Sequence, residues 1–257
     1  MTQAILYLVI FAALQILPGS LLTALWPLTG STALTTTDIQ IISMVVSALL
    51  VFLVFIRLKW ACPTRDYLLS RPWVVVFWCV IAAIGVVIPS TWLQEQLPEL
   101  PNLIEAELGD ILLHRGGYFV VCILAPLAEE LAFRGAILRT LLAWRPANVW
   151  PMIAVSAFFF ALIHMNPAQM PHAFLMGLLL GWMYVRTGSI VPGVAFHWAN
   201  NTVAYLLFRA YPDPSMRLAD YFSGDTRAVG AAVIFSLFIL VPAIYQLHLF
   251  MRRPKAA

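Results

Sequence analysis

Long apolar stretches separated by short polar segments dominate the sequence. Windows of about 20 apolar residues predict helices that cross a membrane. We therefore predict an all-α, polytopic membrane protein, a helical bundle with about eight transmembrane helices. The predicted spans lie near residues 4–27, 39–56, 72–92, 116–142, 148–165, 171–186, 190–209 and 228–251.

Composition supports the same class. Hydrophobic residues make up 62% of the 257 residues and charged residues 11%, whereas a soluble domain has about 45–50% and about 25%. The net charge of +3 comes from 15 basic and 12 acidic residues, without the long basic block that a nucleic-acid partner needs. Cys62, Cys79 and Cys122 are isolated, so we expect apolar filling and neither a disulfide framework nor a thiolate metal site.

Basic residues near the span ends predict the orientation in the membrane. Arg57, Lys59, Arg65 and Arg71 surround one short loop, and a further basic cluster ends the chain. If both groups lie on the cytoplasmic side of the membrane, we expect both chain termini to be cytoplasmic. We divide the single membrane domain into N-terminal helices with an acidic connecting segment (1–115), a core (116–209), and a last loop, helix and basic tail (210–257).

The fourth predicted span carries three charged residues near its middle, Glu129, Glu130 and Arg134. An ionised group in the bilayer interior costs at least about 2.5–3.5 kcal/mol, so these residues require an explanation. Glu130 and Arg134 are four residues apart and share a helix face, where they can neutralise each other. Glu129 lies about 100° around the helix, outside that pair, and could act as a general base.

Two later spans add polar groups. Phe160 and His164 are four residues apart at the end of an apolar run, and His197 and Asn201 are four apart in the seventh span. A single histidine in a transmembrane helix more often forms a hydrogen bond to a neighbouring helix than takes part in catalysis. Together with the glutamates and the arginine, they form a set that can activate water and stabilise an oxyanion.

Three interpretations of these polar residues remain open at this point. The first is an enzyme, and the second is a non-catalytic membrane protein, such as a bacteriocin-immunity factor or scaffold, with a static buried network. The third is a transporter, because buried Glu and His also serve proton relays. The absence of repeated halves with paired broken helices weakens the third.

The order of the motifs resembles that of a known family. The chain reads Glu129-Glu130-xxx-Arg134, then Phe160-xxx-His164, then His197-xxx-Asn201. This EExxxR, FxxxH, HxxxN series, on successive membrane helices, resembles the CAAX prenyl protease and bacteriocin-processing family, also called CPBP or ABI. The resemblance covers roughly residues 120–205.

The resemblance implies an intramembrane endopeptidase of the glutamate type. Glu129 and His164 would activate the attacking water, and His197 and Asn201 would bind the oxyanion. Glu130, Arg134 and Phe160 would support them. The expected partner is a peptide or protein substrate at the bilayer, which could be lipidated, and the expected location is a bacterial cytoplasmic membrane.

We expect no cofactor and no metal, because the sequence lacks the HExxH pair of a zincin, although ligands from separate helices could still hold zinc. The span boundaries raise one difficulty. At about 1.5 Å per residue, they put Glu129 and His197 nearer the inner face and His164 nearer the outer face, although the three side chains must meet.

Overall fold

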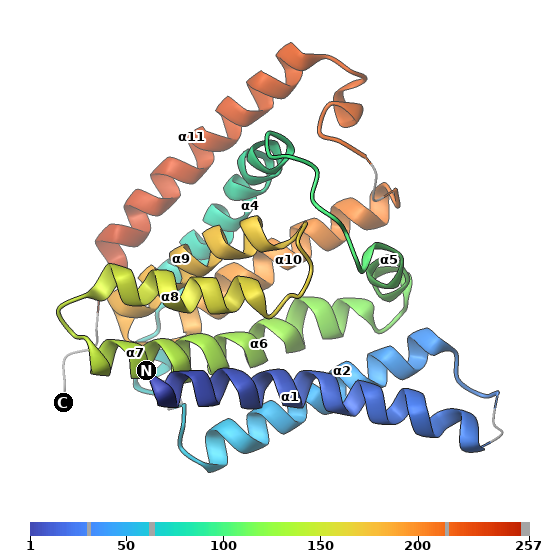
Figure 1. Cartoon of the computed structure of the whole chain (residues 1–257). Helices are drawn as coiled ribbons and strands as arrows, with labels where there is room; N and C mark the ends of the chain where they lie inside the picture. The colour runs from blue at the N-terminus through green and yellow to red at the C-terminus, as the bar shows by residue number, and fades with distance from the viewer. Residues whose placement is uncertain (30–31, 62–64, 214–215, 253–257) are drawn as a thin grey trace.

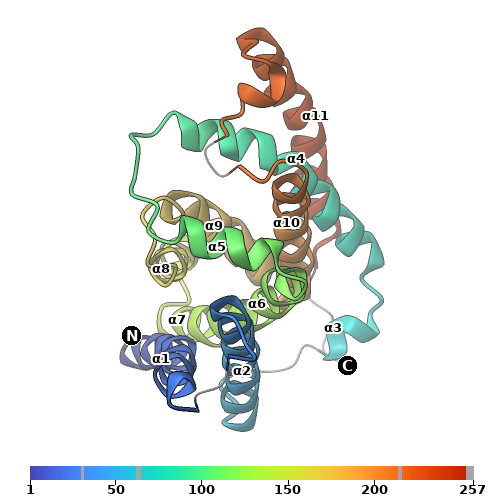
Figure 2. The same cartoon turned by 90° about the vertical axis from the view of Figure 1, so that its right-hand side faces the viewer.

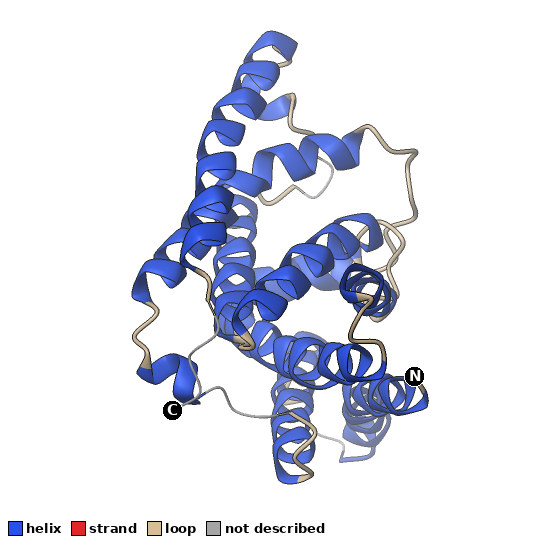
Figure 3. Ribbon diagram, turned by 90° about the vertical axis from the view of Figure 1, so that its left-hand side faces the viewer, coloured by secondary structure: helices blue, strands red, loops and turns tan. Residues whose placement is uncertain are grey.

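The computed structural model of the chain describes residues 1–29, 32–61, 65–213 and 216–252. Within these residues every regular element is a helix, as Figure 3 shows. Each of the eight predicted segments coincides with a helix or a continuous run of helical elements. The all-helical class is therefore confirmed. Cys79 and Cys122 are buried free thiols, whereas Cys62 lies outside the described residues.

The helices vary widely in length, and the central one is assembled from several pieces. Residues 117–144 form one uninterrupted helix in which two π-helical segments alternate with α-helical ones. The elements are α1 (Thr2–Leu25), η1 (Trp26–Thr29), α2 (Thr36–Arg57), α3 (Arg65–Leu69), α4 (Trp73–Glu95), α5 (Glu105–Leu113), η2 (Phe119–Leu124), α6 (Ala125–Glu130), η3 (Leu131–Leu138), α7 (Arg139–Trp144), α8 (Val149–Leu162), α9 (Met170–Thr187), α10 (Val191–Ala210), η4 (Asp220–Phe222) and α11 (Thr226–Phe250).

Four helices are long and apolar enough to cross a membrane by length and composition: α1 with η1, α2, α4 and α11. The number of about eight crossing helices is not confirmed. The remaining apolar segments are shorter or carry the polar residues of the predicted site. The 14 residues of α8 extend about 21 Å, less than the hydrocarbon thickness of about 30 Å.

Two pairs of helices pack closely at glycines, which have no side chain. A Cβ on Gly85 of α4 would lie 2.7 Å from the backbone nitrogen of Leu240 in α11, and a Cβ on Gly177 of α9 would lie 2.8 Å from Ala157 in α8. Glycine at both positions therefore lets two helices approach closely. Figures 1 and 2 show α4 beside α11, α8 beside α9, and α1 crossing α2.

The central helix lies between the α1–α2 pair on one side and α8, α9 and α10 on the other (Figure 1). Its buried side chains form one apolar core with Phe11 of α1, Phe55 of α2 and Ile153 of α8. The glutamates are carried by this helix, so they are surrounded by protein. The first residues of α1 and the last residues of α11 lie at the same end of the bundle.

Candidate active site

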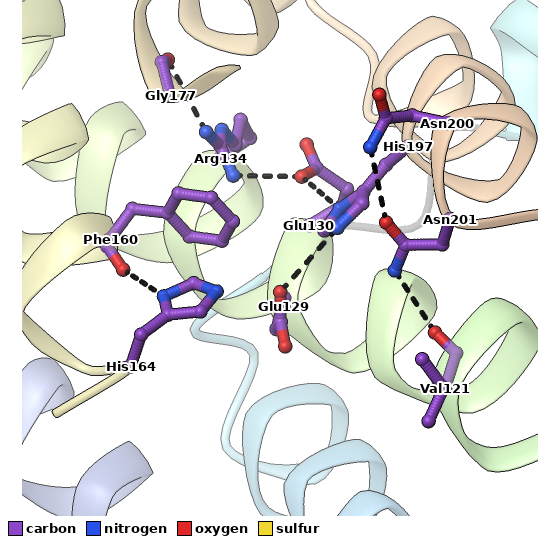
Figure 4. A network of polar contacts seen from close by, with 10 residues as sticks. All are labelled: Val121, Glu129, Glu130, Arg134, Phe160, His164, Gly177, His197, Asn200 and Asn201. Carbon is purple, nitrogen blue, oxygen red and sulfur yellow. Dashed lines mark hydrogen bonds and ion pairs between the residues drawn. The ribbon is translucent and has the colours of Figure 1, made fainter. Parts of the chain in front are cut away.

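The predicted site residues come from three regions of the fold and face one another (Figure 4). Glu129 and Glu130 end α6, and Arg134 lies in η3 one turn later. Phe160 lies near the end of α8, His164 follows that helix, and His197 and Asn201 lie on α10. Segments far apart in the sequence thus bring their polar groups to the middle of the central helix.

Glu130 and Arg134 form the ion pair that their spacing predicts. Arg134 Nη1 donates to Glu130 Oε1 at 2.7 Å, and the two side chains are 1% and 0% exposed. Arg134 Nη2 donates to the Gly177 carbonyl at 3.3 Å, and its guanidinium carbon lies 4.4 Å from the centre of the Phe160 ring. A charge pair with such complete burial needs these additional partners, because desolvation opposes its formation.

Phe160 connects this ion pair to both histidines. Its ring packs edge-on against His164, with centroids 5.1 Å apart, and against His197, with centroids 5.8 Å apart. The side chain is 2% exposed. The FxxxH spacing therefore places an aromatic ring where it holds two imidazoles at fixed angles.

His197 lies between the two glutamates. Its Nδ1 is 3.3 Å from Glu130 Oε1, and its Nε2 is 3.8 Å from Glu129 Oε2. A carboxylate oxygen can only accept, so Nδ1 carries the proton in the contact with Glu130. The other ring nitrogen then faces Glu129, and the imidazole links the buried glutamate to the more exposed one.

Glu129 faces a cavity. Its side chain is 18% exposed, against 0% for Glu130, and within the described residues its one close polar neighbour is His197. The cavity has a volume of about 200 Å³, enough for several water molecules. Its walls also include His164, and its complete lining is Phe11, Gln15, Met44, Ala48, Val120, Ala125, Ala128, Glu129, Ile163 and His164.

His164 has a defined tautomer. Its Nδ1 lies 2.8 Å from the Phe160 carbonyl, which can only accept, so Nδ1 donates and Nε2 of the neutral ring keeps its lone pair. The turn after His164 is fixed by buried Asn166, which donates to the Asn102 side chain at 2.8 Å and accepts from the Leu103 backbone at 3.0 Å. His164 is thus oriented from both sides.

The short α8 explains how His164 and Glu129 reach the same cavity. The sequence predicts a crossing helix over 148–165, with His164 near the outer face. The helix ends at Leu162, and the chain turns into α9 eight residues later. His164 therefore follows a helix that is too short to cross, and it lines the same cavity as Glu129. The central helix is also unbroken at Pro126.

Asn201 has a structural contact that spacing alone does not reveal. Its Nδ2 donates to the Val121 carbonyl at 3.0 Å, and Asn200 Nδ2 approaches its Oδ1 at 3.4 Å. At the end of η2 the Ala125 N–H donates to the Val120 carbonyl, five residues earlier. In the same pattern the Val121 carbonyl would accept from residue 126, but Pro126 has no N–H. Asn201 therefore donates to the Val121 carbonyl in place of the missing backbone N–H. Short π-helical segments of this kind are frequent at functional sites.

Gly193 is a further residue of the site that the sequence analysis missed. A Cβ at this position would lie 2.6 Å from Glu130 Oε2. That oxygen is buried and has no hydrogen-bond partner in the described residues. Gly193 follows Pro192 at the start of α10, where a glycine is unremarkable in the sequence. Its close contact with Glu130 is seen only in the packed structure.

The described part of the chain contains no group of three or more His, Cys, Asp or Glu side chains placed to hold a metal ion. Glu129 and His197 are close to each other, and Glu129 and His164 share a cavity. The arrangement contains a carboxylate (Glu129), an imidazole whose Nδ1 is held by a backbone carbonyl (His164), and a second imidazole beside a buried charge pair (His197). Such a set can deprotonate water and stabilise a developing negative charge.

The comparison with protein families gives one match. Residues 114–203 match the model described as type II CAAX prenyl endopeptidase Rce1-like. Neither curated proteins nor solved structures gave a match to the chain. The matched segment contains all seven predicted site residues and supports a membrane endopeptidase in general terms. The family resemblance inferred from the three motifs is thereby confirmed over residues 114–203, about a third of the chain.

Proposed function

We propose that this protein is an intramembrane glutamic endopeptidase that hydrolyses a peptide bond at the level of the Glu129 cavity. The observation that carries the proposal is the shared cavity: Glu129 and His164 line it from different helices, and His197 Nε2 is 3.8 Å from Glu129. A general base must come within hydrogen-bond reach of water and substrate, and these groups face the same space.

Charge balance supports Glu129 as the base. Arg134 compensates Glu130 in the fully buried pair, so Glu129 lies outside that pair and its carboxylate is available to accept a proton. In the proposed step, water in the cavity loses a proton to the Glu129 carboxylate while its oxygen attacks the scissile carbonyl carbon. The His164 Nε2 lone pair accepts a hydrogen bond from the same water and orients it. Glu129 then passes the proton to the leaving amine, which releases acid and amine products.

The oxyanion of the tetrahedral intermediate needs donors that are fixed before the reaction. His197 is held by Glu130 through Nδ1, and a proton on its Nε2 would make that nitrogen a donor to the oxyanion. Asn201 uses one amide hydrogen on Val121 and has a second for the oxyanion. Both residues project from α10, so one rigid helix presents both donors.

The proposed substrate is a peptide segment of a membrane-associated protein, including proteins with a lipidated C-terminus. The experiment compares new protein N- and C-termini between cells that express the wild-type chain and cells that express Glu129→Gln. We expect a defined set of cleaved termini that disappears in Glu129→Gln and persists in Glu107→Gln, a variant of an exposed carboxylate on α5.

Identical termini in wild type and Glu129→Gln would contradict the proposal and favour a non-catalytic role. For the metal-free form of the mechanism, we expect cleavage of an identified substrate to continue unchanged in the presence of a chelator. Loss of activity that zinc restores would replace it with a metallopeptidase mechanism.

We also propose that the end of the bundle where α1 begins and α11 ends faces the cytoplasm, because Arg57, Lys59 and Arg71 lie at the end of α2 and in the segment before α4. Reporter fusions to the two termini test this orientation. Activity of an externally active reporter at either terminus would reverse it.

A further inference from the structure

The cavity that contains Glu129 has a second wall outside the segment matched by the family. Phe11 and Gln15 of α1 and Met44 and Ala48 of α2 face it, whereas the family match begins at residue 114. The other wall is built by η2, α6 and the end of α8. The N-terminal helices therefore complete the cavity in which the proposed reaction occurs.

Gln15 is the polar member of this wall. Between Leu8 and Gly19 it is the one residue of α1 with a polar side chain. Its side-chain amide makes no hydrogen bond to any residue that the structure describes, whereas Gln3 in the same helix donates to the Tyr7 hydroxyl at 2.6 Å. An amide without a hydrogen-bond partner is unfavourable in an apolar environment. Gln15 is partly buried on the cavity wall, so a partner for it is expected to enter the cavity.

The position of Gln15 is fixed by packing. The Ser47 hydroxyl of α2 approaches the Gln15 backbone carbonyl at 3.4 Å, and Ser47 is 2% exposed. Phe11, one turn earlier, packs edge-on against Phe133 of the central helix, with ring centroids 5.2 Å apart. These contacts attach α1 to the same helix that carries Glu129.

A primary amide is complementary to a peptide backbone. Its Nε2 hydrogens donate to a peptide carbonyl, and its Oε1 accepts from a peptide N–H. The neighbouring Phe11, Met44 and Ala48 are apolar and suit the side chains of a membrane-associated peptide. Water would satisfy the amide equally well but would leave these apolar surfaces without a partner.

We propose that Gln15 binds the backbone of the substrate peptide and holds it against the α1–α2 wall, opposite Glu129 and His164. This inference rests on the proposed endopeptidase function. It adds a substrate-binding residue from the N-terminal helices, so substrate preference is determined in part outside the family segment.

The test measures kcat and KM for purified protein with a substrate peptide identified from the cellular comparison. Gln15→Leu removes both hydrogen-bonding groups at similar size. We expect KM to rise about tenfold, the effect of one or two lost hydrogen bonds, with little change in kcat, because the contact is made equally in the ground state and the transition state. Leu17→Ala on the exposed face of α1 is the control, and we expect its KM to equal that of the wild type.

A second readout does not depend on turnover. A photo-crosslinking side chain at position 15 in the Glu129→Gln background should capture the peptide, and the same group at position 17 should not. Unchanged KM in Gln15→Leu, or equal capture at both positions, would overturn this inference while wild-type cleavage leaves the endopeptidase proposal intact. If wild type and Glu129→Gln fail equally to cleave, the proposed function falls, and this inference falls with it.

Discussion

Glu129 and Glu130 are neighbours in the sequence and differ in almost every physical respect. Glu130 is 0% exposed, bonds to Arg134 at 2.7 Å and lies 3.3 Å from His197, whereas Glu129 is 18% exposed and faces a cavity. One residue of helix corresponds to about 100° of rotation, which separates a buried structural carboxylate from one that can reach water. The comparison teaches that two adjacent, identical side chains acquire different surroundings from the surfaces they face, and our proposal gives them different roles for that reason.

The two glutamates are nevertheless coupled through His197. Its Nδ1 contacts Glu130 and its Nε2 faces Glu129, so the buried charge pair orients the imidazole that lies beside Glu129. Substitution of Glu130 or Arg134 can therefore destabilise the buried pair without removing a group that we propose contacts substrate. The next predictions use this separation.

The largest effect is expected when the buried pair loses its cation. Arg134→Leu leaves Glu130 buried and uncompensated, and we expect the free energy of unfolding to fall by about 3–5 kcal/mol. Thermal unfolding in detergent measures it. The double variant Arg134→Leu with Glu130→Gln should recover most of the loss because no unpaired charge remains. A double variant as unstable as the single one would show that the pair is not the cause.

A smaller effect is expected from crowding the other side of Glu130. Gly193→Ala would bring a Cβ within 2.6 Å of Glu130 Oε2, and relieving that contact should cost about 1–3 kcal/mol of stability. We expect activity to fall as well, because the Glu130 carboxylate positions His197. Gly230→Ala on α11, where a Cβ meets nothing within 4 Å, is the matched control. Equal stability of the two variants would refute the close contact.

The smallest of these effects concerns the carbonyl that Pro126 leaves free. Asn201→Ala removes the donor to Val121 and should cost about 1–2 kcal/mol of stability. Pro126→Ala supplies a backbone N–H in the same turn, so the loss from Asn201→Ala should be reduced in that background. Strict additivity of the two substitutions in a double-mutant cycle would argue against a shared carbonyl.

The contacts that could be predicted from sequence are those within one helix. The Glu130–Arg134 pair and the Phe160–His164 contact follow from i,i+4 spacing, and the helices follow from apolar windows. The contacts between helices could not be predicted. Asn201 bonds to Val121 because of a π-helical segment, and His164 lines the cavity because α8 is short. Gln15 lines the same cavity as Glu129 because α1 packs on the central helix.

The most direct test of the division between the two glutamates compares Glu129→Gln with Glu130→Gln in one preparation. Cleavage of an identified substrate and thermal unfolding are measured on both variants. We predict that Glu129→Gln loses activity about thousandfold or more, in the range of a lost general base, with unchanged unfolding, and that Glu130→Gln unfolds at lower temperature. Full activity in Glu129→Gln would contradict the account.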